Sequence, residues 1–255
     1  MTAALELTDA TVKRGGKVVL DAAGVVVQPG EVVGVVGANG AGKTTLLRAA
    51  LGLARLEPGG AAVLAGREVA ALSDAERAAL AAYLPQERRV GWNLPAWRVA
   101  SLGAFERPPK EARAAALRAL ARVGLLDLQD RGVLDMSGGE RARALLARLL
   151  AAGAPLLVAD EPAAGLDPDA QLLAMGLFRE EAKTGAGVLV TLHDLSLAAR
   201  FCDRVVVLAQ GRVMADGSPR SSLNVDVLAA AFGLDGDLIE TAVGPVLAAR
   251  RRRLH

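Results

Sequence analysis

The stretch Glu31–Ala50, EVVGVVGANGAGKTTLLRAA, decides the fold class of this chain. It opens with a continuous apolar run, which is typical of a strand buried on both faces of a sheet. Residues 37–44, GANGAGKT, then match the pattern G-x-x-x-x-G-K-[ST], and the residues that follow have helical spacing. Strand, glycine loop and helix in this order predict a phosphate-binding loop in an α/β protein.

The glycine loop carries residue types that suit a nucleoside triphosphate. Its glycines let successive backbone N–H groups turn toward one anion, and the following helix adds the positive end of its dipole. Lys43 can reach the β- and γ-phosphates, and Thr44 can ligate Mg²⁺ through its hydroxyl. A glycine-rich turn with an incidental lysine is the alternative, but the full context favours ATP and Mg²⁺. The residues expected to contact the nucleotide here are Gly37, Asn39, Gly40, Ala41, Gly42, Lys43, Thr44 and Thr45.

The composition agrees with a cytosolic or membrane-peripheral protein. Of the 255 residues, 52% are hydrophobic and 3% aromatic, which suits helices packed on a sheet. The net charge of +2 implies no nucleic-acid footprint. The single cysteine, Cys202, allows no internal disulfide and indicates a reducing compartment. The N-terminus has no apolar core of signal-peptide kind, and no uncharged run exceeds 11 residues, against roughly 18 needed to span a bilayer.

The rest of the chain alternates between strand-like and helical patterns. Residues 5–12 and 22–28 resemble two antiparallel strands. Residues from about 90 to 135 have leucine and alanine at helical spacing and no strand candidate, which predicts an inserted helical subdomain. Strand–helix alternation returns after it, up to a strand pair that turns at Gln210–Gly211. We therefore expect an α/β P-loop NTPase core with a mostly parallel sheet, an N-terminal antiparallel β subdomain and an inserted α-helical subdomain.

The domain assignment follows from these patterns. Residues 1–220 are expected to form a nucleotide-binding domain that contains the helical insertion. Residues 221–255 form a C-terminal extension with one expected helix, VDVLAAAFG (225–233). The basic end of the extension, RRRLH (251–255), is expected to be frayed.

Two adjacent carboxylates supply the second half of a nucleotide site. The run LLVADEP (156–162) ends a strand in Asp160 and Glu161, at the sheet edge where open α/β proteins bind ligands. Alone, such a pair is more often a helix cap or a solvated pair, but beside a phosphate loop the functional interpretation is favoured. Asp160 is expected to belong to the Mg²⁺ shell. Glu161 is expected to orient or deprotonate the attacking water.

Two further polar residues follow neighbouring strands. His193 comes directly after VLVTL and is one of only two histidines in the chain, the other being His255. Its placement at a strand end favours a role in holding the γ-phosphate and the water over a structural one. Gln86 follows another short strand in YLPQE, and it is expected to contact Mg²⁺ or the water. For Gln86 a plain polar loop residue is the alternative.

A second glycine motif, SGGE (137–140), also opens a helical pattern. Ser137 and Glu140 have the spacing of a capping box, so a well-made helix terminus is the simplest interpretation. A cap does not need the two glycines between them, and removing side chains from a helix mouth suits the close approach of an anion. We therefore expect Ser137, Gly138 and Gly139 to contact the ATP held by the P-loop of a second copy, in a symmetric dimer.

The motifs together resemble the ATP-binding subunit of an ABC transporter, from about Leu5 to Gly217. The matching elements, in family order, are Walker A GANGAGKTT, Gln86 of the Q-loop, the signature MSGGE, Walker B LLVADEP, the D-loop AGLD ending at Asp167, and the switch histidine His193. The resemblance implies dimeric ATP hydrolysis at the cytoplasmic face of the inner membrane. It further implies two permease subunits as partners and, indirectly, a substrate-binding protein.

Looser motifs place the chain near one subfamily. TLHDLSLAARFCDRVVVLAQGRVMADGSP (191–219) and RVASLGAFERPP (98–109) are similar to importers of iron–siderophore complexes, haem and vitamin B12. The family usually carries an aromatic residue that stacks on adenine, where this chain has Arg14 or, by another alignment, Lys13. A guanidinium can also stack on a base.

Other readings remain open for the function. An ABC ATPase for a different solute shares every motif named above. A DNA-maintenance ATPase shares the P-loop and signature, but it separates them by a long coiled-coil arm, for which residues 90–135 are too short. A P-loop kinase would leave SGGE and AGLD unexplained.

Overall fold

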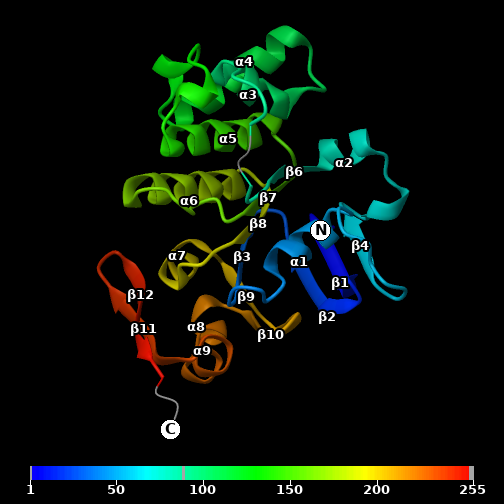
Figure 1. Cartoon of the computed structure of the whole chain (residues 1–255), viewed down its shortest axis with the longest axis vertical. Helices are drawn as coiled ribbons and strands as arrows, with labels where there is room; N and C mark the ends of the chain where they lie inside the picture. The colour runs from blue at the N-terminus through cyan, green and yellow to red at the C-terminus, as the bar shows by residue number, and fades with distance from the viewer. Residues whose placement is uncertain (1, 88–89, 253–255) are drawn as a thin grey trace.

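The computed structural model describes residues 2–87 and 90–252 (Figure 1). The strands are β1 (Leu5–Arg14), β2 (Lys17–Val27), β3 (Val32–Val36), β4 (Ala61–Leu64), β5 (Arg67–Glu68), β6 (Ala81–Leu84), β7 (Leu156–Asp160), β8 (Gly187–Thr191), β9 (Arg204–Ala209), β10 (Arg212–Gly217), β11 (Leu234–Thr241) and β12 (Gly244–Arg251). The helices are α1 (Lys43–Ala50), α2 (Asp74–Leu80), α3 (Ala96–Ser101), α4 (Pro109–Arg122), α5 (Gly138–Ala152), α6 (Pro168–Lys183), α7 (Leu195–Phe201), α8 (Pro219–Ser222) and α9 (Val225–Phe232). Within these residues, no helix is both long and apolar enough to cross a lipid bilayer.

The central sheet has the strand order β10-β9-β3-β8-β7-β6. The pairs β3–β8, β3–β9, β7–β8 and β6–β7 are parallel, and only the edge pair β9–β10 is antiparallel. A second sheet, with the order β2-β1-β4-β5, is antiparallel throughout. The expected α/β class, with a mostly parallel core and an N-terminal antiparallel sheet, is confirmed.

The central strands are buried on both faces, and alternate residues serve two separate cores. In β3, Val32 and Val36 belong to one core, which contains α4 to α7. Val33 and Val35 belong to the other core, which contains α1 and the N-terminal sheet. This alternation follows from the two-residue period of a strand, and it explains why the sequence of β3 is apolar without interruption.

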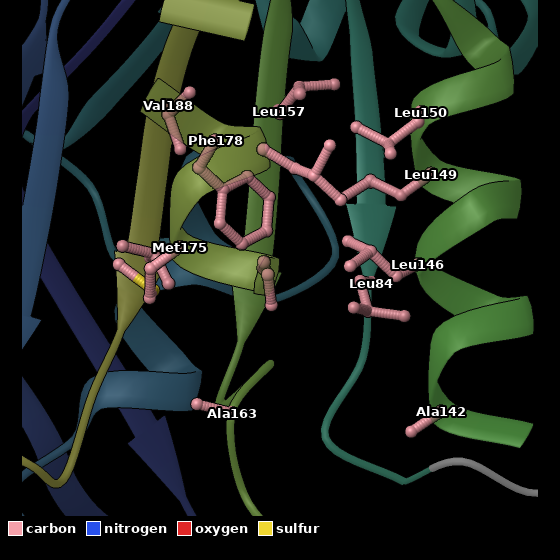
Figure 2. Close-up of a cluster of buried hydrophobic side chains, with 14 of the residues drawn as sticks. Leu84, Ala142, Leu146, Leu149, Leu150, Leu157, Ala163, Met175, Phe178 and Val188 are labelled. Carbon is pink, nitrogen blue, oxygen red and sulfur yellow. The ribbon is translucent and has the colours of Figure 1, made fainter. Parts of the chain in front are cut away.

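Helix α6 joins the helical insertion to the central sheet. Figure 1 shows α3, α4 and α5 gathered at one end of the molecule, with α6 between α5 and α7. Figure 2 shows the Phe178 ring of α6 beside Val188 and Leu157 of the sheet, and Leu149 of α5 close by. Phe178 is fully buried, so apolar contacts form the centre of this junction. Ion pairs from Arg122 of α4 to Glu180 and Glu181 of α6 add polar contacts at its exposed side.

Two parts of the fold differ from the sequence expectations. The C-terminal extension contains the expected helix α9, but it continues into an antiparallel hairpin, β11–β12, that the sequence analysis did not predict. The hairpin lies against α7, where the backbone N–H of Leu247 donates to the Ser196 hydroxyl at 3.0 Å. The basic end, residues 251–255, was expected to be frayed. For its first residue, Arg251, this expectation is wrong, because Arg251 is the last residue of β12. Residues 253–255 of the basic end lie outside the described residues.

The close packing of β3 against α7 gives a testable stability effect. A Cβ on Gly34 would lie 2.6 Å from the Cys202 Sγ, well inside normal contact, so Gly34→Ala is expected to lower the free energy of unfolding by about 1–3 kcal/mol. Adding Cys202→Ala removes the colliding sulfur and is expected to recover much of that loss. Gly176→Ala in α6 is the control, because a Cβ there meets nothing within 4 Å. Urea unfolding of the three variants checks this, and equal costs in the single and double variants would contradict the packing argument.

Candidate functional site

Four adjacent parallel strands deliver polar residues to one edge of the central sheet. The strand β3 runs into the glycine loop, β6 is followed by Gln86, β7 ends in Asp160, and β8 is followed by His193. A cavity of about 480 Å³ opens at this edge. Its lining residues are Arg14, Val19, Asn39, Gly40, Ala41, Gly42, Lys43, Thr44, Thr45, Gln86, Glu161 and His193.

The glycine loop needs its glycines for two reasons, which are a lack of space for side chains and a left-handed backbone. A Cβ on Gly37 would lie 2.3 Å from the Leu208 carbonyl oxygen, so the neighbouring backbone leaves no room for a side chain. Gly42 has a φ of 105° and also packs against the Val19 carbonyl. Gly40 has a φ of 79° but open space around it. Gly37 and Gly42 therefore let the loop pack closely against the core, and Gly40 gives it a left-handed turn.

The start of α1 is left open for an anion. Its N-cap is Gly42, which has no side chain to accept a hydrogen bond from the first turn, and that turn contains no acidic residue. The backbone N–H groups of a helix start therefore point into the cavity, together with the positive end of the helix dipole. A phosphate group is the ligand that this arrangement favours.

Lys43 lies folded over the loop. Its ammonium donates hydrogen bonds to the carbonyl oxygens of Gly37 at 2.9 Å and Ala38 at 3.3 Å. Burial lowers the pKa of Lys43, while the nearby Glu161 and Asp160 carboxylates act in the opposite direction. A buried ammonium held by neutral carbonyls is well placed to exchange them for an anionic partner.

The chemistry of Asp160 fits a divalent cation. Its side chain is 1% exposed, and Oδ1 accepts a hydrogen bond from the Thr191 hydroxyl at 2.6 Å. Oδ2 is buried and accepts no hydrogen bond from the described part of the chain. An orphaned buried carboxylate oxygen is costly unless a cation joins it. No group of three or more His, Cys, Asp or Glu among the described residues could hold a metal by itself, and Mg²⁺ typically uses one or two carboxylates together with substrate phosphates.

Three side chains that the sequence predicts to be catalytic meet at Glu161. Its Oε2 accepts a hydrogen bond from Gln86 Nε2 at 2.8 Å, and its Oε1 lies 2.5 Å from His193 Nε2. The Glu161 backbone has a φ of 51°, in the left-handed region that side chains rarely adopt. The sheet edge thus holds one carboxylate between an amide and an imidazole, next to the glycine loop.

The structure separates the two candidates for contact with the base. Arg14 lies at the end of β1 and lines the cavity beside Val19. Lys13 points to another partner, because its ammonium forms a salt bridge with Glu57 at 3.1 Å. Of the two, Arg14 is the one that lines the cavity.

The Ser-Gly-Gly motif does not line this cavity. It opens α5, where Ser137 and Glu140 form the expected capping box, with the Ser137 hydroxyl accepting from the Glu140 N–H at 3.2 Å. The Ser137 backbone N–H donates to Glu140 Oε2 at 2.8 Å, and this hydrogen bond is the main cause that holds the pKa of Glu140 below its usual value. Gly138 and Gly139 have no positive φ, and a Cβ on either would meet nothing within 4 Å. Neither the backbone nor the packing of this chain therefore requires glycine at these two positions.

Comparison with known proteins identifies the family. A family model described as ABC transporter matches residues 20–164, which is more than half of the chain. The chain belongs to the ABC transporter family. The resemblance predicted from the ordered motifs is confirmed.

Relatives of this ABC chain are described as import ATP-binding proteins. It is 42% identical over 237 residues to a cobalamin import ATP-binding protein, BtuD, of Halobacterium salinarum, and the match covers 89% of this chain but 58% of that protein's length. It is 38% identical over 247 residues to a hemin import ATP-binding protein, HmuV, of Bordetella avium, covering 92% of this chain and 94% of the relative. A solved ATP-binding cassette, a dimer in a post-hydrolysis state with ADP and phosphate, has a TM-score of 0.76 and 26% identity, and the match covers 85% of this chain and 99% of that one.

Two polar residues of this ABC cassette were not found from sequence. Thr191 joins Asp160 to the backbone of Glu161, and Gln171 of α6 donates to the carbonyl oxygens of Ala163 and Leu166 in the loop after β7. A polar residue that ends a buried apolar strand, as Thr191 does in GVLVT, is the signal that could have identified the first. No sequence signal marks Gln171, because its partners are backbone atoms.

Proposed function

We propose that this chain is the ATP-hydrolysing subunit of an ABC importer, which drives uptake of an iron–siderophore complex, haem or vitamin B12 through a membrane permease. The observation that carries the proposal is the Glu161 carboxylate held between Gln86 and His193 beside an open phosphate loop. The relatives described as cobalamin and hemin import proteins support the solute class. An ABC ATPase for another solute is the alternative, and it would use the same site.

The P-loop and the sheet edge bind different parts of the Mg-ATP complex. The open start of α1 and the Lys43 ammonium take the phosphates, and Arg14 stacks on the base. Thr44, Asp160 and Gln86 would hold Mg²⁺, which would supply charge neutralisation for the phosphates. The Oδ2 of Asp160 supports this assignment, because it is a buried carboxylate oxygen with no hydrogen-bond partner among the described residues.

Glu161 acts on the attacking water. Its carboxylate orients that water and accepts a proton from it, while His193 contacts the γ-phosphate and keeps the carboxylate in place. The left-handed backbone at Glu161 supports this role, because strained conformations of this kind persist where the surrounding structure fixes a functional side chain.

The active form is a dimer in which each subunit completes the site of the other. Ser137, Gly138 and Gly139 of one copy cap the ATP that the P-loop of its partner holds. The two glycines support this, because no contact among the described residues of their own chain requires them, and a helix mouth without side chains admits a phosphate closely. A solved relative that is dimeric with ADP and phosphate also supports the assembly.

Permease subunits dock on a hollow beside the helical insertion, and a substrate-binding protein acts through them. A hollow of about 250 Å³ lies between the β6 region, α5 and the turn after α3. Leu102 and Phe105 are 54% and 60% exposed there, which is unusual for large apolar side chains on one face.

Docking on the permease would hold the chain at the cytoplasmic face of the membrane as a peripheral subunit. Co-purification with a polytopic membrane protein tests it, and recovery of the chain alone from gently solubilised membranes would contradict it.

His193→Ala is expected to abolish turnover while leaving nucleotide binding largely intact. Removing the imidazole takes away the partner of Glu161 Oε1 but none of the phosphate-loop contacts. Steady-state hydrolysis should fall at least about a hundredfold, the range of a positioned proton-transfer group. Equilibrium binding of a fluorescent ATP analogue should change by no more than about two- to threefold, since binding energy resides mainly in the phosphate loop. Loss of binding would instead assign His193 a structural role.

A further inference from the structure

Thr191 is a polar residue at the end of a strand that is otherwise apolar. It closes β8, is 0% exposed, and lies in register with Val35 of β3 on one side and Asp160 of β7 on the other. A buried hydroxyl must find hydrogen-bond partners, and a valine of similar shape would satisfy this position without any. The choice of threonine at the centre of the sheet therefore calls for a reason.

The Thr191 hydroxyl makes two hydrogen bonds to consecutive residues, Asp160 at the end of the neighbouring strand β7 and Glu161 directly after it. It donates to Asp160 Oδ1 at 2.6 Å, and it accepts from the backbone N–H of Glu161 at 2.8 Å. The first bond fixes the rotation of the Asp160 carboxylate. It leaves Oδ2 as the carboxylate oxygen without a hydrogen-bond partner among the described residues. The second bond holds the Glu161 N–H at the point where the backbone turns into the left-handed region, at a φ of 51°.

We propose that Thr191 is a positioning residue that sets the metal-binding carboxylate and the water-activating carboxylate in one geometry. One hydroxyl group makes both bonds. The bond that it donates sets the orientation of the Asp160 carboxylate. The bond that it accepts holds the turn that aims the Glu161 side chain between Gln86 and His193. The bond to an ionised carboxylate is of the charge-assisted kind, which is stronger than a neutral one. This inference rests on the proposed function, because it assigns Asp160 to Mg²⁺.

The alternative is that the hydroxyl only satisfies a buried carboxylate and contributes to folding. The two explanations make different predictions for Mg²⁺. A folding role affects the stability of the protein without ligand. A positioning role affects how much Mg²⁺ is needed and how fast ATP is hydrolysed, even in protein that is fully folded.

Thr191→Val, Thr191→Ser and Thr191→Ala separate the hydroxyl from the methyl group. We expect Thr191→Val to bind a fluorescent non-hydrolysable ATP analogue in EDTA within about twofold of the unmodified chain, because the phosphate loop is untouched. The Mg²⁺ concentration for half-maximal tightening of that binding should rise about tenfold or more, and kcat at saturating Mg²⁺ should fall about tenfold to a hundredfold with little change in KM. Thr191→Ser keeps the hydroxyl and should restore both values to within about threefold.

Val188→Ala is the matched control. It shortens a buried side chain of the same strand that has no contact with the site, so it should lower the melting temperature without moving the Mg²⁺ requirement. If Thr191→Val does not fold, the comparison of Thr191→Ser with Thr191→Ala takes its place, because these differ in the hydroxyl and not in the methyl group. A serine variant no better than the alanine or valine variant, or a valine variant with the Mg²⁺ requirement and kcat of the unmodified chain, would overturn the proposal. Absence of any Mg²⁺-dependent nucleotide binding in the unmodified chain would instead refute the proposed function.

Discussion

Glu161→Gln is expected to lower ATP hydrolysis by about a hundredfold to ten-thousandfold, the range measured for a positioned general base. It is also expected to trap an ATP-bound dimer. The amide keeps the size and shape of the carboxylate, and its oxygen can still accept from Gln86 or face His193. It cannot take a proton from water. Binding and dimerisation therefore proceed, but the step that separates the two copies does not follow.

Size-exclusion chromatography with light scattering tests the dimer directly. The Glu161→Gln variant should elute as a dimer with Mg-ATP and as a monomer with ADP or EDTA. The control is Lys43→Ala in the same background, which removes the ammonium over the P-loop and should leave a monomer in every condition. A Glu161→Gln protein that stays monomeric with Mg-ATP would refute the shared site. A variant that hydrolyses ATP at the unmodified rate would refute the role of Glu161.

The fold was predictable where it depends on local sequence. The P-loop could be identified because it needs glycine at fixed positions. At Gly37 and Gly42, a side chain would collide with the backbone of neighbouring segments. The meeting of Gln86, Glu161 and His193 was predictable for a different reason. Parallel strands end at the same edge of a sheet, so residues that directly follow such strands gather there whatever their separation along the chain.

The remainder depends on partners that are distant in sequence. Arg14 could be distinguished from Lys13 only through the Lys13–Glu57 salt bridge, which joins β1 to the loop before β4. The hairpin β11–β12 was missed because its packing against α7, and not its own pattern, makes it a strand pair: LDGDLIET contains two aspartates and a glycine, which are weak strand formers. Thr191 was missed because its partners, Asp160 and Glu161, are 31 and 30 residues away in the sequence and come next to it only in the folded sheet.

Mixing two inactive variants is expected to restore ATP hydrolysis, and this is the second large effect. Lys43→Ala removes a phosphate contact, and Gly138→Asp places a carboxylate at the mouth of α5, where it would repel a triphosphate. Neither change should unfold the chain. A Cβ on Gly138 meets nothing within 4 Å, and an aspartate in the first turn of a helix is favourable to the helix dipole. Each variant alone should hydrolyse ATP at least about a hundredfold more slowly than the unmodified chain, because every site either lacks the Lys43 ammonium or carries a repelling carboxylate.

The mixture distinguishes a shared site from one built within a single chain. In a dimer of one Lys43→Ala copy and one Gly138→Asp copy, one site receives both defects. The other combines the intact P-loop of the second copy with the intact signature loop of the first. A mixed dimer can still bind ATP at its whole site, so it forms even where a dimer of two Lys43→Ala copies does not. Random pairing in equal amounts would make half of the dimers mixed and about a quarter of all sites whole, so activity should rise to about a quarter of the unmodified rate or more. If each chain used its own Ser-Gly-Gly motif, no whole site could form and the mixture would stay as inactive as its parts.

Gly138→Ala in place of Gly138→Asp should show a smaller initial loss, since a methyl group obstructs the phosphate without repelling it. The charge at the mouth of α5, and not the mere loss of glycine, then accounts for the larger defect.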